Sequence, residues 1–318
     1  MAISVIDSAS GMRQVLDAAP DERAARVREL WEPMAGLYSF IPGGMDLVTA
    51  HHQSFGFPVG GPETLVDRLR QGLDELVAAD AWSRVSTALA EGVAALTSAM
   101  PELELPDLRV LLVLGDPTNA HFMDEVGGLS GFGGISGFIV ITVWPHPVVL
   151  DRLEAIVVHE LHHNVRYSPG GIVWDPSTVT VGEHVISEGL ADLFAVELYG
   201  ERGYTHFVSD DTRKSDAVLA KVASGLGVRG MSDFASWVLG DATAELFGAE
   251  PVGLPTGAGY AAGVRLVRAY LDDAETSAAR STRTPAAELL DVALPRLGLA
   301  PQRDSLNNRA STVFRRDA

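Results

Sequence analysis

Two histidines four residues apart, His159 and His163, stand in the sequence HELHH with Glu160 between them. On a helix this spacing places both imidazoles on one face, one turn apart, where they can hold a single metal ion. Glu160 lies roughly 100° around the helix from His159, so it is not a third ligand but can reach a water on the metal. A carboxylate in that position takes a proton from the water and passes it to the leaving group, which is the chemistry of hydrolysis.

A catalytic zinc ion takes three protein ligands and keeps one position open. Two kinds of third ligand are common after an HExxH motif. The first is a histidine six residues after the second histidine, but Pro169 stands there. The second is a glutamate of a later helix in the pattern ExxxD, and Glu188 and Asp192 fit it. We therefore expect Glu188 to be the third ligand of one zinc ion, with Glu183 or His184 as the alternatives.

Asp192 follows Glu188 by one helical turn and faces the same way. From there it can accept the second N–H of a ligating histidine, which fixes the tautomer and raises the basicity of the ring. The alternative interpretation is a helix N-terminal carboxylate at Glu188, favoured by the helix dipole, and a solvated side chain at Asp192. Apolar neighbours favour paired burial instead: Val185, Ile186, Leu190, Leu193 and Phe194.

The oxyanion formed during hydrolysis needs a donor besides the metal, usually a tyrosine or a histidine. Tyr260 is the first candidate because its neighbours in GAGYAAG are small and allow a substrate to approach. The alternative for Tyr260 is a core tyrosine at the start of a helix. Tyr167, at the end of the metal helix, and His184, four residues before Glu188, are lesser candidates.

The elements that must position these residues follow from hydrophobic spacing. Apolar residues at helical intervals predict three helices in the first hundred residues. Short apolar runs bounded by Pro and Gly predict a small sheet, in which a glycine-rich stretch precedes the second strand. The ranges are helices in 21–39, from Glu63 and in 80–98, and a sheet in 105–146 with strands at 108–114 and 138–144 and glycines at 127–137.

Helical patterns return after the sheet and predict the two metal helices and a helical C-terminal lobe at 201–303. The metal helices are expected at 148–167 and 182–200. We divide the chain into a helical N-terminal region, 1–104, and a catalytic region, 105–318, or else a single continuous domain. The fold class is α+β: mainly helical, with a small mixed or antiparallel sheet beside the metal helix and the active site in a cleft between lobes.

Two helix motifs together resemble the gluzincin pattern, namely AIVVHELHHNVRY (155–167) and VISEGLADLFAVELYG (185–200). More narrowly, they resemble the YjaZ-like family of predicted zinc-dependent proteases. The later segment AGYAAGVRLVRAYL (258–271) is similar to the C-terminal AGY-xx-G helix of that family. The resemblance covers roughly 105–272 and leaves the first hundred residues unmatched. It implies a zinc peptidase-like fold, and it leaves the natural substrates undefined.

Composition limits the partners. The 318 residues include 24 basic and 42 acidic side chains, a net charge of −18, which repels phosphate backbones and disfavours nucleic acid. There is no cysteine, so His and carboxylate must hold any transition metal. No apolar stretch is long enough to span a bilayer, and no basic segment followed by an apolar run indicates a signal peptide. The expected location is cytoplasmic, and the oligomeric state is not indicated.

The leading functional hypothesis is a zinc metallopeptidase that acts on a peptide or protein. A second hypothesis keeps the metal but acts on one dedicated substrate, as an amide hydrolase or a peptide-tailoring enzyme. A third is a non-catalytic metal-binding protein, against which the intact Glu160 argues because a structural zinc does not need it. Peptides often bind such enzymes as an added strand at a sheet edge, and GGISGF before IVITV is the candidate edge. The adjacent pair His51 and His52 is interpreted as structural or exposed.

Overall fold

The computed structural model describes residues 2–299, which its contacts divide into two compact units. The first unit comprises the described residues up to Val173, together with Leu190–Phe207 and Thr276–Arg283. The second comprises Trp174–Gly189, Val208–Glu275 and the described residues from Thr284 onward. The last part of the predicted catalytic region, 300–318, lies outside the described residues. The predicted domain boundaries and the cleft between lobes stay predictions.

A four-stranded mixed sheet forms the centre of the first unit, in the order β1-β2-β4-β3. The first three strands in that order run parallel, and β3 is antiparallel to β4. The strands are β1 (Ile3–Val5), β2 (Leu108–Leu114), β3 (Leu129–Phe132) and β4 (Phe138–Val143). β2 and β4 are almost completely buried, as their continuous apolar runs predict for strands covered on both faces.

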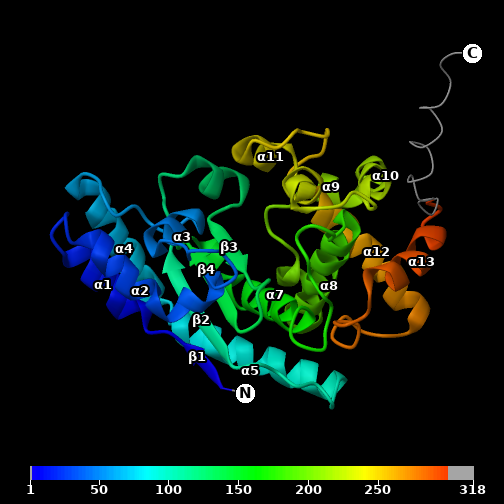
Figure 1. The fold of residues 1–318 in the computed structure, drawn as a ribbon, viewed down its shortest axis with the longest axis horizontal. Coiled ribbons are helices and arrows are strands. Elements are labelled where there is room, and N and C mark those ends of the chain that lie inside the picture. Colours follow the sequence, from blue (N-terminus) through cyan, green and yellow to red (C-terminus); the bar gives the residue numbers. More distant parts are fainter. Residues whose placement is uncertain (1, 300–318) are drawn as a thin grey trace, which may run out of the picture. The chain divides into compact units, whose positions relative to one another are not determined.

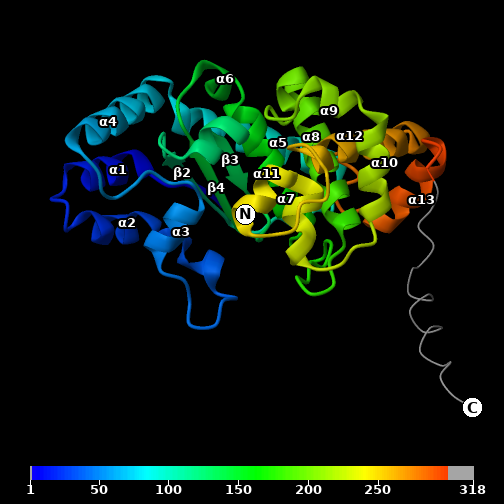
Figure 2. The same ribbon diagram turned by 90° about the horizontal axis from the view of Figure 1, so that it is seen from above.

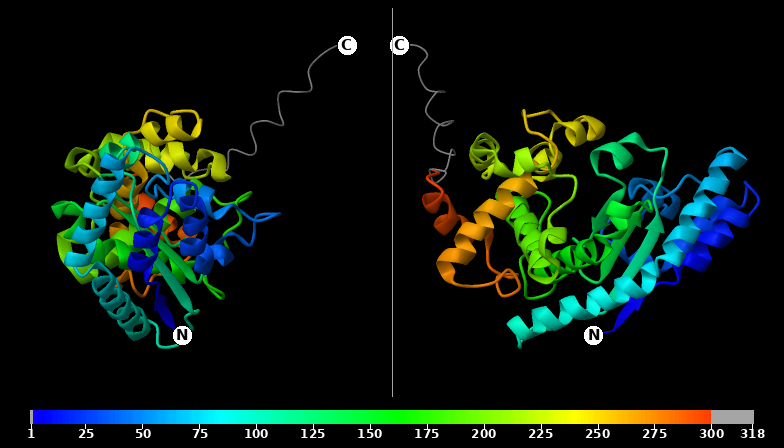
Figure 3. Two further views of the ribbon diagram at one scale, coloured as in Figure 1. Left: turned by 90° about the vertical axis from the view of Figure 1, so that its left-hand side faces the viewer. Right: turned by 180° about the vertical axis from the view of Figure 1, so that it is seen from behind.

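Helices cover both faces of this sheet. Figure 1 shows α1 (Ser8–Asp17), α2 (Arg23–Trp31) and α4 (Glu63–Ala78) on one side and α7 (Leu153–Arg166) on the other. The right-hand view in Figure 3, from behind, shows the long α5 (Ala81–Ala99), which packs against β1 and against α7. Leu69, Leu73 and Leu76 of α4 are buried, which is the apolar stripe that their spacing predicts.

Shorter elements complete the first unit. They are η1 (Glu32–Tyr38), α3 (Leu47–Gln53), η2 (His121–Glu125), α6 (Pro147–Leu150) and η3 (Gly200–Gly203). Asp7 caps the N-terminus of α1 and Asp46 that of α3, by accepting hydrogen bonds from the backbone N–H groups of Ser10 and Thr49. The helix α8 (Val181–Tyr199) begins among residues of the second unit and ends among those of the first.

The second unit is helical. Its centre is α12 (Ala258–Ala274), which packs against α10 (Asp216–Gly225) and α13 (Ala286–Arg296), as the view from above in Figure 2 shows. A salt bridge between Arg265 of α12 and Asp216 of α10 measures 2.6 Å. The remaining elements are α9 (Asp210–Lys214), η4 (Met231–Asp233), η5 (Ala235–Leu239) and α11 (Asp241–Phe247).

The α+β class, mainly helical with a small mixed sheet, is confirmed. Several local features differ from the sequence patterns. The strand β1 and the helices α1 and α3 are additional elements of the N-terminal region, and β3 lies within the glycine-rich stretch. The predicted helix 148–167 is divided into α6 and α7. Among the described residues, no helix combines the length and the apolar character needed to cross a membrane.

Candidate metal centre

The helix α7 carries the HELHH sequence, and it lies between the sheet and α5. The residues from Val157 to Arg166 are all buried. Arg84 of α5 fixes the start of α7 by donating to both carboxylate oxygens of Glu154, at 2.6 and 2.7 Å, and to the carbonyl of Leu150. Packing on all sides therefore fixes the position of α7, and with it the position of the two histidines, in the first unit.

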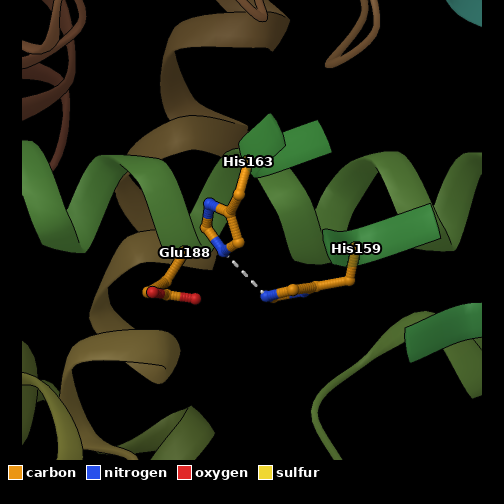
Figure 4. Close-up of side chains that lie close together, drawn as sticks. All are labelled: His159, His163 and Glu188. Atoms are coloured by element: carbon orange, nitrogen blue, oxygen red, sulfur yellow. Dashed lines mark hydrogen bonds between the residues drawn. The ribbon is translucent and has the colours of Figure 1, made fainter. Parts of the chain in front are cut away.

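Three buried side chains converge beside α7. One ligand atom each of His159, His163 and Glu188 lies within 4.8 Å of the others, and the three side chains point toward one another in Figure 4. The Nε2 atoms of the two histidines are 3.0 Å apart. The exposed fractions are 4% for His159, 7% for His163 and 8% for Glu188. Two imidazoles and a carboxylate gathered in this way could hold one metal ion.

This donor set fits zinc. Two imidazole nitrogens and one carboxylate oxygen are the ligands of many catalytic zinc sites. With zinc–nitrogen bonds of about 2.0–2.1 Å and tetrahedral angles, two ligating nitrogens stand about 3.4 Å apart. The 3.0 Å between the Nε2 atoms of His159 and His163 is close to that value, so a small adjustment of either ring accommodates the ion.

Asp192 lies behind the first histidine. Its Oδ1 is 3.0 Å from Nδ1 of His159, and the exposed fraction of the residue is 2%. Thr205 donates its hydroxyl to Oδ1 at 2.7 Å and its backbone N–H to Oδ2 at 3.2 Å. Because Nδ1 of His159 faces a carboxylate, it carries the proton, and Nε2 presents its lone pair toward His163 and Glu188.

Glu160 faces the sheet. A Cβ atom added to Gly131 of β3 would lie 2.3 Å from Oε1 of Glu160, and one added to Gly133 would lie 2.1 Å from the carbonyl oxygen of Glu160. Glycine is therefore required at position 133, where any other residue would collide with the backbone of α7, whereas a larger residue at position 131 would displace the Glu160 side chain. The glycine-rich segment thus packs directly against Glu160. Its strand, β3, is an edge strand of the sheet.

Glycines also bring two motif-bearing helices of the second unit together. A Cβ atom at Gly189 of α8 would lie 2.3 Å from the backbone of Gly263 in α12, and one at Gly263 would lie 2.1 Å from the carbonyl oxygen of Val185. The sequences SEGLA and AGYAAG thus meet at a close helix crossing. Glu188 precedes Gly189, and Tyr260 lies one turn before Gly263.

The remaining candidates occupy different surroundings. Tyr167 is the C-terminal cap of α7 and is half-buried, as is Tyr260. His184 is buried, with its ring centroid 4.6 Å from that of Phe234. His162 packs against Phe194 of α8, and burial lowers its pKa well below the ordinary value, so it is neutral. The oxyanion roles considered for Tyr260, Tyr167 and His184 stay predictions.

Two polar residues near the centre have no role in the sequence-based assignment. Thr205 supplies both of its donors to Asp192. Asn164 follows His163 and is buried at 1% exposure. The signal for Asn164 was its spacing of four residues from Glu160, which puts both on one face of the helix; Thr205 has no comparable local signal.

Comparison with known proteins gives two matches. The model of a family described as predicted Zn-dependent protease (DUF2268) matches residues 90–291. The uncharacterized protein YjfC of Bacillus subtilis (strain 168) is 34% identical over 188 residues, which are 58% of this chain and 60% of that protein. The chain thus spans less than two thirds of the length of this relative.

Proposed function

The chain belongs to the family of predicted zinc-dependent proteases, and from that premise we propose that it hydrolyses peptide bonds with one zinc ion and with Glu160 as the general base. The membership confirms the resemblance to the YjaZ-like family. The observation that carries the proposal is the buried convergence of Glu188 of α8 with His159 and His163 of α7, the helix that also bears Glu160. A structural zinc site would have no use for a carboxylate in that place.

The proposed zinc ligands are His159, His163 and Glu188. When bound, zinc polarises a substrate carbonyl and lowers the pKa of a coordinated water. Asp192 holds the Nδ1 proton of His159, so that the ligating Nε2 keeps its lone pair. Glu160 accepts the proton of the attacking water and delivers it to the departing amine.

The wall around Glu160 supports this assignment. Gly131 and Gly133 pack against its side chain and its backbone, so the carboxylate has little freedom to turn away from the reacting water. A base whose geometry is set before the reaction needs no reorganisation in the transition state. Glu160 is also 5% exposed, and a dry environment strengthens its interaction with a developing charge.

The oxyanion donor remains a proposal with Tyr260 as first choice. The helix crossing at Gly189 and Gly263 supports it, because that crossing joins the helix of Tyr260 to the helix of Glu188. Tyr167 and His184 are the alternatives.

The edge predicted from the sequence, GGISGF before IVITV, is wrong, because IVITV lies in β4, which pairs with β2 on one side and with β3 on the other. We propose instead that the substrate binds as an added antiparallel strand along β3. Within the described residues β3 pairs only with β4, so its other edge offers backbone donors and acceptors. Gly131, which touches Glu160, belongs to this strand. A peptide bond paired with β3 would therefore lie near the general base.

The alternative hypotheses differ in substrate or in chemistry. An amide hydrolase or peptide-tailoring enzyme with a dedicated substrate would use the same residues, and activity restricted to one sequence would favour it. A non-catalytic metal protein would bind zinc and cleave nothing. The cytoplasm stays the proposed location, because a chain without cysteine has no disulfide to form in an oxidising compartment.

The decisive experiment measures zinc content and peptide cleavage in the same preparations. Glu160→Gln should keep one zinc per chain and lose cleavage of a mixed peptide library, because the amide cannot accept a proton. Glu188→Ala should lose zinc and activity together. Glu183→Gln is the matched control on α8 and should retain both. A zinc-loaded wild type that cleaves no peptide contradicts the proposal.

A further inference from the structure

The helix α7 carries a second pair of residues one turn apart. His159 and His163 form the first pair, and Glu160 and Asn164 form the next row around the helix. The histidine pair lies next to Glu188, and the pair Glu160 and Asn164 contacts the glycine-rich segment formed by β3 and the loop after it. The sequence HELHHN thus places two functional rows side by side, of which the proposed function uses all but Asn164.

Asn164 holds the segment 133–137 through its side-chain amide. Its Nδ2 is 3.1 Å from the carbonyl of Gly133, 2.8 Å from that of Ile135 and 2.9 Å from that of Phe138. Its Oδ1 accepts the backbone N–H of Gly137 at 2.9 Å. One buried side chain therefore satisfies both ends of a loop that has no regular pairing of its own.

Only an amide suits this position. The opposite orientation of Asn164 would place Oδ1 against three carbonyl oxygens and Nδ2 against an N–H, so the donor side is unambiguous. Aspartate has the same size but would present a second oxygen to the three carbonyls. Alanine would leave the carbonyls of Gly133, Ile135 and Phe138 without this donor in a buried place.

The loop held by Asn164 directly follows β3, the strand that packs against the Glu160 side chain. Gly133 accepts from Asn164 through its carbonyl oxygen, and its Cα approaches the carbonyl of Glu160 so closely that a Cβ atom would be 2.1 Å away. Two residues earlier, Gly131 lies against the Glu160 carboxylate. The position of this segment therefore determines the space in which the carboxylate can turn.

We propose that Asn164 is a positioning residue for Glu160: it fastens the loop 133–137 to α7 and thereby keeps β3 against the carboxylate. Its catalytic consequence rests on the proposed function, in which Glu160 is the general base. The fastening of the loop is a structural claim and can be tested without a substrate.

The first test compares Asn164→Ala and Asn164→Asp with wild type in zinc-loaded protein. Both variants should keep one zinc per chain, and backbone amides at 133–138 should exchange hydrogen at least about tenfold faster. With a cleaved peptide, kcat should fall about 100-fold and KM should change little, because a shift of about 1 Å in a reacting group has that cost. If Asn164 only fills space, Asn164→Asp will behave as wild type.

A second test disturbs the contact between Gly133 and the carbonyl of Glu160 and leaves the hydrogen-bonding side chain of Asn164 in place. Gly133→Ala forces the segment that follows β3 away from the carbonyl of Glu160 and should reproduce the loss of kcat. Gly134→Ala is the matched control, because its Cβ would meet only the ring of Phe132 at 3.5 Å, an ordinary contact. Thr142→Val on β4 controls for stability: it removes the 2.7 Å hydrogen bond from the Thr142 hydroxyl to the carbonyl of Ser54, and loop exchange and kcat should stay unchanged.

The outcomes separate the two proposals. Unchanged exchange at 133–138 in Asn164→Ala overturns the fastening. Faster exchange with wild-type kcat, or a loss confined to KM, overturns the positioning role. If wild type cleaves no peptide, the proposed function fails, and the exchange data alone decide whether Asn164 holds the loop.

Discussion

Asp192 is a buried carboxylate whose charge is compensated entirely by donors. It accepts hydrogen bonds from Nδ1–H of His159 and from the hydroxyl and the backbone N–H of Thr205. Such compensation is needed because an unpaired buried carboxylate is costly. The same contacts orient the ring of His159, so the stability of the carboxylate and the geometry of the proposed ligand depend on one set of hydrogen bonds.

Asp192→Asn should weaken zinc binding without unfolding the protein. The amide keeps the size of the side chain and accepts one hydrogen bond, but it lacks the charge that raises the basicity of His159. We expect the zinc dissociation constant to rise about 10- to 100-fold, measured by competition with a chelator. Asp151→Asn, which removes an exposed ion pair with Arg202, should leave it unchanged. Equal zinc affinity in wild type and Asp192→Asn would remove the assigned role.

His51 gives a prediction on pH and stability. Trp31 donates to its Nδ1 at 3.0 Å and its Nε2 lies 2.7 Å from the carbonyl of Phe57, so the buried ring is neutral. Burial lowers its pKa from 6.5 to about 4. In the unfolded chain His51 therefore binds a proton below about pH 6.5, whereas in the folded chain it stays neutral down to about pH 4. The free energy of unfolding consequently decreases as the pH falls from 6.5 to 4.

Between pH 8 and pH 5 this single group should cost about 2 kcal/mol in the free energy of unfolding. His51→Gln should be less stable than wild type at pH 8. Its free energy of unfolding should, however, fall by about 2 kcal/mol less than that of wild type between pH 8 and pH 5. Urea unfolding at the two pH values measures it. The exposed neighbour provides the control: His52→Gln should show nearly the wild-type dependence, because the charge of His52 is the smallest of the causes that set the pKa of His51. A His51→Gln protein with the same dependence would contradict the assigned pKa.

At the scale of elements, close glycine contacts set the spacing of α8 and α12. Gly189 faces the backbone of Gly263, and no flexible side chain can move to make room. Because Glu188 precedes Gly189, the crossing also fixes the position of the proposed third ligand. The segments SEGLA and AGYAAG, two of the three that carry the family resemblance, thus meet in one contact.

Gly189→Ala should therefore affect folding and metal binding together. Overpacking of this kind costs about 1–3 kcal/mol, and the displaced helix should also raise the zinc dissociation constant. Urea unfolding and chelator competition measure the two effects. Gly60→Ala, where an added Cβ meets nothing within 4 Å, should be neutral in both. A stable Gly189→Ala protein with wild-type zinc affinity would show that the crossing is not constrained.

The sequence predicted the elements whose signals are local. The ligand spacing of α7, the burial of β2 and the stripe of α4 all follow from neighbouring residues. The strand Ile3–Val5 escaped prediction because its three residues are held by pairing with a strand about a hundred residues later. The break between α6 and α7 accompanies the contact of Arg84 with Leu150 and Glu154, which is tertiary.

The same distinction holds within the site. The spacing of His159, Glu160 and His163 is a property of one helix, so the sequence alone indicates it. The role of Asn164 depends on where the loop 133–137 runs, and Thr205 matters only because it meets Asp192. Contacts of this kind join segments that are distant in the chain. The spacing of Asn164 from Glu160 places both on one face of α7, but it does not indicate which segment Asn164 binds.

At the scale of the whole molecule, the net charge of −18 is the dominant electrostatic property. A protein of that charge attracts cationic molecules over distances set by the Debye length, which is about 30 Å at 10 mM salt and about 10 Å at 100 mM. The attraction acts on the rate of encounter and not on the chemical step. A peptide substrate rich in lysine should therefore benefit from it.

We expect kcat/KM for a cleaved peptide with lysine flanks to exceed that of its glutamate-flanked twin at 10 mM salt, with the ratio falling at least about threefold by 500 mM. The charge of the protein does not change with salt, so the fall reports screening of the encounter. A serine-flanked peptide is the neutral control and should be nearly independent of salt. If the lysine preference persists at 500 mM, it arises from direct contacts beside the site, and long-range attraction is not its cause.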